Sequence, residues 1–63
     1  MNGQCAGIRE QARERALAEY GDLSRRELRR TEDLLLRAAS EQVGRADREV
    51  LDGELAAVAE LLG

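Results

Sequence analysis

The sequence predicts an all-α protein of one small domain, built either as a three-helix bundle or as a helical hairpin with a kinked second helix. The chain has 63 residues, contains no proline, tryptophan or phenylalanine, and has a single aromatic side chain, Tyr20. Its core must therefore come from leucine, valine and alanine, which is typical of helical proteins. Apolar residues recur at spacings of three and four, the period of an amphipathic helix, and a helix-capping signal lies in the first half of the chain.

The first helix is expected over residues 5–20. Its apolar stripe is narrow and consists mostly of small side chains, so it can approach a neighbouring helix closely. The stripe comprises Cys5, Ile8, Ala12, Ala16 and Tyr20. The charged residues are expected to form a solvated outer face with ion pairs at helical spacing, namely Glu10 with Arg13 and Arg15 with Glu19. We expect Gly21 to end this helix as a C′ residue in the left-handed conformation.

The second helix is expected over residues 25–43, and its start is the clearest local signal in the chain. Ser24 is placed as the N-cap, and Glu27 three residues later completes a capping box. Leu23 and Leu28 occupy the N′ and N4 positions of a hydrophobic staple.

This second helix carries more leucine than one neighbouring helix can cover. One side of it has Leu28, Leu35, Leu36, Ala39 and Val43. Leu34 points elsewhere, because successive residues are 100° apart around a helix. The run at 34–36 therefore indicates burial against two surfaces, and a second chain is a candidate for one of them.

A third helix is expected over residues 46–62, after a break at Gly44–Arg45. Its main stripe lies about a third of a turn from that of the second helix. The stripe consists of Leu51, Leu55, Val58 and Leu62. Ala46 and Val50 continue the earlier spacing through the break, so one continuous helix is the alternative. Gly53 costs ~1 kcal/mol relative to alanine inside a helix, or it marks a kink.

The composition excludes the common kinds of enzyme chemistry. Histidine and lysine are absent, so no serine or cysteine has such a base beside it for nucleophilic catalysis. Cys5, the only cysteine, can form neither an internal disulfide nor a zinc cluster. We therefore expect no enzymatic activity, no cofactor and no metal site. A chain this short buries little surface, so association is the remaining way to gain stability.

The predicted location is cytoplasmic. No apolar run approaches the ~20 residues of a membrane span, and the first residues lack the apolar segment of a signal peptide. The thiol of Cys5 is then expected to be reduced.

Charge is distributed unevenly along the chain. The net charge of −3 argues against nonspecific binding of nucleic acid. Residues 1–30 carry seven arginines against five acidic residues, and residues 31–63 carry three against eight. Two copies of the chain can therefore pair antiparallel through their unlike halves.

Two sets of residues are candidate binding sites. The apolar set, predicted to contact a protein partner or a second copy, comprises Leu34, Leu36, Leu51, Leu55, Val58 and Leu62. The second set, the arginine cluster, comprises Arg25, Arg26, Arg29 and Arg30. It lies at the N-terminal end of the second helix and opposes the helix dipole there. Candidates to offset its charge are Asp33, the acidic third helix of the same or another chain, an acidic protein, or nucleic-acid phosphate.

The leading hypothesis is a self-associating, non-enzymatic module that binds another protein as an adaptor, an assembly factor or an inhibitor. The surplus of leucine faces is the observation behind it. The alternative is a nucleic-acid-associated regulator that uses the arginine cluster at residues 25–30. Single-strand binding usually adds aromatic stacking platforms, and only Tyr20 is present, so we expect nucleic acid less than protein.

Overall fold

The structure of the chain, a computed structural model, describes residues 4–63 and their side chains from Gly7 onward. It contains three helices: α1 (Gln4–Tyr20), α2 (Arg25–Ser40) and α3 (Arg45–Leu62). No strand occurs within residues 4–63, so the all-α prediction is confirmed. Cys5 belongs to α1, but its side chain lies outside the described ones.

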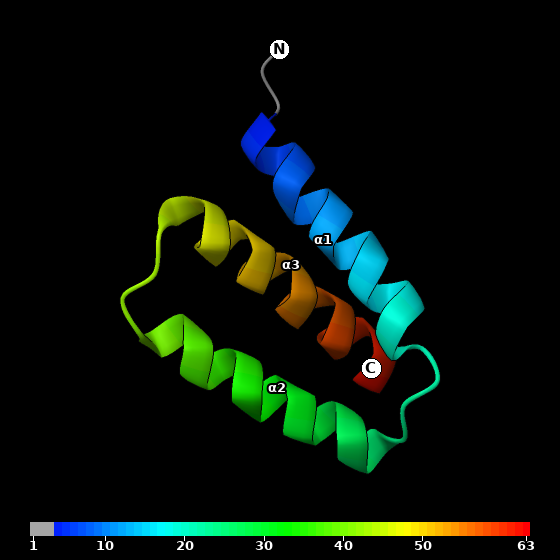
Figure 1. The fold of residues 1–63 in the computed structure, drawn as a ribbon. Coiled ribbons are helices and arrows are strands. Elements are labelled where there is room, and N and C mark those ends of the chain that lie inside the picture. The colour runs from blue at the N-terminus through cyan, green and yellow to red at the C-terminus, as the bar shows by residue number, and fades with distance from the viewer. Residues whose placement is uncertain (1–3) are drawn as a thin grey trace.

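The last helix in the sequence is the central one in space: α3 lies between α1 and α2 (Figure 1). α1 and α3 run parallel, and α2 runs antiparallel to both. α3 packs most extensively against α1 and less against α2, whereas direct contact between α1 and α2 is slight. The packing of the chain therefore depends on two helix pairs that share α3.

The seam between α1 and α3 is made of small residues. The buried residues along it are Ala12, Ala16, Gly53 and Ala57. A Cβ atom on Gly53 would lie against the carbonyl oxygen of Arg9 and 2.9 Å from the Cβ of Ala12, closer than two such carbon atoms can pack. Gly53 is therefore required by the close approach of the two backbones. It does not mark a kink that ends the helix, because α3 continues through it.

The predicted start of α2 is confirmed. The Oγ of Ser24 accepts a hydrogen bond from the backbone N–H of Glu27 at 3.2 Å, and the Oε1 of Glu27 accepts one from the backbone N–H of Ser24 at 3.0 Å. These bonds satisfy two backbone donors that the helix leaves free. Leu28 is buried and Leu23 is half-buried, in agreement with the staple positions.

The predicted end of α1 is right in position and wrong in conformation. α1 ends at Tyr20, but Gly21 is not left-handed, since no residue within 4–63 has a positive φ. Instead the N–H of Leu23 donates to the carbonyl of Tyr20 at 3.1 Å. This bond closes a turn that needs no left-handed residue.

α2 and α3 are separate helices, as predicted, but α2 ends at Ser40, three residues earlier than expected. The Oγ of Ser40 donates to the carbonyl of Arg37 at 2.8 Å, and the N–H of Glu41 donates to the carbonyl of Ala38 at 3.2 Å. Both bonds satisfy carbonyls of the last turn and tighten it. Gly44 is the N-cap of α3, with an extended backbone (φ −68°, ψ 164°).

The buried core is small for the number of aliphatic side chains. The sequence has ten leucines, three valines and one isoleucine, yet only Leu28 and Val58 among them are buried. The others are half-buried or exposed. Much of the aliphatic surface is therefore open to water in a single copy. None of the helices within residues 4–63 has the length and apolar character needed to cross a membrane.

Candidate protein-interaction surface

The predicted apolar contact set is divided by the fold. Leu34 and Leu36 are 57% and 53% exposed. Leu51, Leu55 and Leu62 are half-buried. Val58 is fully buried and belongs to the core of the chain itself, because α3 is covered by both of its neighbours. Val58 is thus not open to a partner in this fold, and a contact role for the other five residues remains a prediction.

Leu34 and Leu36 lie on opposite edges of α2. The buried Leu28 marks the side of α2 that faces α3, and Leu35, two helical turns further on, lies on the same side. Positions 34 and 36 are separated by about 200°, so one falls on each flank. Packing within the chain therefore covers Leu35 best and leaves Leu34 and Leu36 exposed to solvent.

A shallow pocket opens on one side of the α1–α3 seam. Its volume is about 100 Å³. It is lined by Ile8, Gln11, Ala12, Arg15, Val50 and Glu54. Val50 is 36% exposed. The sequence did not predict this site, because the apolar period of one helix does not show which residues of a parallel neighbour it meets.

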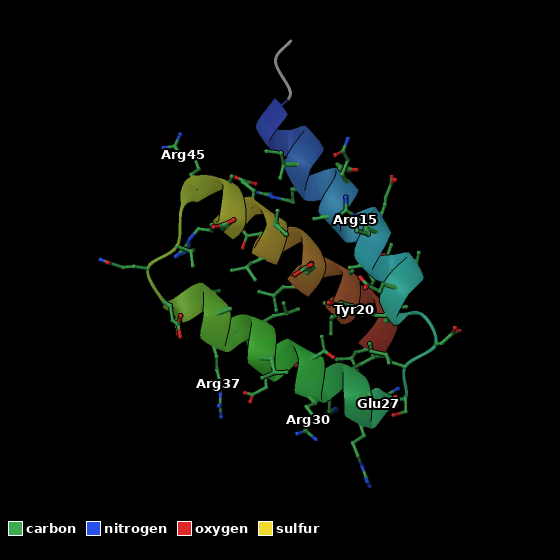
Figure 2. All side chains as sticks on the ribbon, viewed as in Figure 1. Arg15, Tyr20, Glu27, Arg30, Arg37 and Arg45 are labelled. Atoms are coloured by element: carbon green, nitrogen blue, oxygen red, sulfur yellow. The ribbon has the colours of Figure 1, made fainter. Side chains whose placement is uncertain are left out.

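Glu54 lines this pocket without a directly bound cation. It is half-buried and has no hydrogen bond or ion pair with any side chain that the structure describes. Burial raises the pKa of Glu54, the Glu19 carboxylate raises it further, and Arg15 lowers it. Burial raises the pKa of Tyr20, which is labelled in Figure 2, and the carboxylates of Glu54 and Glu19 raise it further. The expected ion pair of Arg15 with Glu19 does not form among the described side chains.

The other side of the seam is bridged by two ion pairs. The Nε of Arg9 lies 3.2 Å from the Oε1 of Glu49, and the Nε of Arg13 lies 2.6 Å from the Oε2 of Glu60. The hydrogen bond and the attraction to Glu60 raise the pKa of Arg13. Arg13 thus pairs across the seam and not with Glu10 of its own helix, because the packing of α1 on α3 brings Glu60 within reach.

The arginine cluster of α2 lies on the surface. Its members Arg25, Arg26, Arg29 and Arg30 are all exposed, and none forms an ion pair within residues 7–63. Asp33 pairs with Arg37 at 3.4 Å instead, so neither Asp33 nor α3 of the same copy offsets the cluster through an ion pair. Figure 2 shows Arg30 and Arg37 projecting from α2 on the side away from α3.

A scan against protein-family models and searches of curated proteins and of solved structures found no match to this chain. In the part of the chain that the structure describes, no group of acidic or cysteine side chains is placed to hold a metal ion. The candidate surface is therefore defined by geometry alone. It consists of the two leucine edges of α2, the pocket beside the α1–α3 seam and the arginine cluster.

Proposed function

We propose that the protein is a small, non-enzymatic protein–protein interaction module that acts through its apolar helix faces as a homo-oligomer. The observation that carries the proposal is the shortage of burial. Of the fourteen leucine, isoleucine and valine side chains, twelve are half-buried or exposed. Fully burying one such side chain contributes about 1.5–3 kcal/mol. A partner that covers several of them would add stability that a chain of 63 residues has little means to supply alone.

An adaptor, an assembly factor or an inhibitor of a larger protein would each use such a surface. Leu34 and Leu36 are its principal contact residues, since more than half of each is exposed. The proposal places the module in the cytoplasm. A chain that cannot form an internal disulfide loses no stability under the reducing conditions there.

Light scattering coupled to size-exclusion chromatography, over a range of micromolar concentrations, tests self-association. We expect a mass above the 7.0 kDa of one copy that increases with concentration. The thermal midpoint should rise with concentration as well, because association stabilises the folded state by mass action. The mass of a single copy at every concentration would remove the homo-oligomer from the proposal.

A second candidate function is a nucleic-acid-associated regulator that uses the arginine cluster. The observation that favours it is the exposure of all four arginines without an ion pair among the described residues. Binding to phosphates would weaken steeply as salt rises, because counterions are released on binding. A mobility-shift assay at low salt with DNA and with RNA tests this function, and the absence of a complex with either would eliminate it.

A further inference from the structure

Leu34 and the pocket lie on the same side of the molecule. Successive residues advance by 100° around a helix, clockwise along α3 when it is viewed from its N-terminus and anticlockwise along the antiparallel α2. With Leu28 turned towards α3, the Leu34 edge of α2 falls on the side of the α1–α3 seam that carries Val50 and Glu54. The Leu36 edge falls on the opposite side, where the two ion pairs bridge the seam.

Residues of α2 and α3 can also be matched by their positions along the helix axes. α2 and α3 are antiparallel neighbours joined by a short connection at residues 41–44, and each rises 1.5 Å per residue. Counting away from the connection along both helices, Leu34 lies level with Val50 and Arg30 lies level with Glu54, to within about one residue.

These four residues form two complementary stripes. Arg30 and Leu34 are four residues apart on α2, and Val50 and Glu54 are four apart on α3, so each pair shares one stripe of its helix. Arg30 and Glu54 have no ion pair among the described side chains. Leu34 and Val50 are 57% and 36% exposed. Each stripe thus has one open apolar side chain and one charge without a partner, and the two charges are opposite.

We propose that this face binds a second copy of the chain across a two-fold axis that runs along the helices. Leu34 of each copy packs against Val50 of the other, and Arg30 of each copy pairs with Glu54 of the other. Rotation about such an axis leaves the position of every residue along the axis unchanged, and it leaves the direction of every helix unchanged. α2 of one copy therefore meets α3 of the other antiparallel, with the apolar residues level and the charges level. This inference rests on the homo-oligomer of the proposed function.

The arrangement favours a second copy because the face is complementary to itself. An interface around a two-fold axis needs one patch that contains both halves of every contact. Here Glu54 and the two apolar side chains are on one face of one copy, and Arg30 projects from the outer border of that face (Figure 2), about one helical turn from Leu34. Both contacts are then made twice in the dimer.

Charge reversal followed by mixing tests the pairing. Arg30→Glu places two carboxylates together at each contact, and Glu54→Arg places two guanidinium groups together. Each variant alone should therefore dissociate about tenfold more readily, or more. An equimolar mixture should regain the dimer, since every mixed dimer has one native pair and one reversed pair. Analytical ultracentrifugation measures the dissociation constants, and circular dichroism checks that each variant is folded.

A matched control variant separates this face from the rest of α2. Arg29→Glu changes the same charge on the other edge of the helix and should leave the dissociation constant unchanged. Leu34→Gln, which removes the apolar contact with Val50, should weaken the dimer about tenfold.

Several outcomes would overturn the proposal. They are dimers of the Arg30, Glu54 and Leu34 variants as tight as the wild type, folded charge variants that do not regain the dimer on mixing, and equal weakening by the Arg29→Glu control. In each of these cases the wild-type chain still self-associates, so the proposed function stands and only this face is excluded. A wild-type chain that stays monomeric would overturn both this face and the homo-oligomer.

Discussion

The two sides of α3 are packed in different ways. Towards α1 the buried residues are alanines and Gly53, and at Gly53 the two backbones are too close for a Cβ atom to fit. Towards α2 the contact depends on larger side chains, of which Leu28 is the one that α2 buries. Small residues close a seam by contact of the backbones, whereas large ones must interdigitate to exclude water. The backbones of α1 and α3 therefore meet within one copy, although a pocket opens beside their seam, and the α2–α3 contact stays open at both edges of α2.

Removing the anchor of α2 should have the largest effect. Leu28→Ala deletes a side chain that is 4% exposed, and such deletions cost about 2–5 kcal/mol. A domain of 63 residues has roughly 3–9 kcal/mol of stability, at about 0.05–0.15 kcal/mol per residue, so we expect the variant to lose about half of it. Urea unfolding followed by circular dichroism measures the loss. Leu36→Ala, at 53% exposure, should lose far less, and an equal loss at both positions would show that Leu28 does not anchor α2.

The tight seam can be tested with one substitution at two glycines. Gly53→Ala should destabilise the protein by about 1–3 kcal/mol, because the added methyl group meets the backbone of Arg9 and the side chain of Ala12. Gly7→Ala should instead stabilise α1 by up to about 1 kcal/mol, since nothing lies within 4 Å of the position of its Cβ. Thermal unfolding of both variants measures the difference. The same sign at both positions would mean that the seam can open without cost.

Local signals along the chain predicted most of the fold. The start of α2 followed from Ser24 and Glu27, because a capping box is an interaction among neighbouring residues. The small-residue stripe on α1 predicted a close helix contact, and Gly53 lies at that contact. The earlier end of α2 and the conformation of Gly21 were missed, since backbone bonds at helix ends depend on the path of the following chain.

The site was less predictable than the fold, because it joins helices that are distant in sequence. Three consecutive leucines correctly indicated that one neighbour could not cover α2. These leucines could not show that Val58 of α3 would be buried between the other two helices. Nor could they show that Val50 would line a pocket with α1. The position of α3 between α1 and α2 decides both, and it depends on tertiary packing that helical periodicity does not encode.

Gly44→Ser should strengthen the start of α3 and leave both of its packed sides unchanged. Gly44 has an extended backbone that any residue can adopt and no side-chain cap, and only Asp47 lies as near as 4.0 Å to a Cβ placed there. We expect a gain of about 0.4–1 kcal/mol from the stiffer unfolded chain, with a further few tenths from the hydroxyl cap. Thermal unfolding at fixed concentration measures the gain, and Gly44→Ala isolates the part that does not depend on the cap.

Glu54→Gln should have the smallest effect on a single copy, and its sign should depend on pH. Because the folded chain raises the pKa of Glu54, it binds that proton more tightly than the unfolded chain, whose glutamates titrate near 4.3. Ionisation of Glu54 therefore lowers the free energy of unfolding. This loss is fully present above the raised pKa and disappears as the pH falls below the unfolded pKa.

At neutral pH, and at a dilution at which the chain is monomeric, the Glu54→Gln variant should thus be slightly more stable than the wild type. The difference should vanish in acid, because both proteins are then neutral at position 54. Thermal midpoints at the two pH values measure it, with Glu10→Gln on the exposed face of α1 as the control. At high concentration the same variant should dimerise less well, because it lacks the charge proposed to bind Arg30. A carboxylate that lowers the stability of the monomer and raises that of the dimer is expected if a second copy covers this face of α3. A Glu54→Gln variant that is less stable than the wild type when dilute at neutral pH would contradict that view.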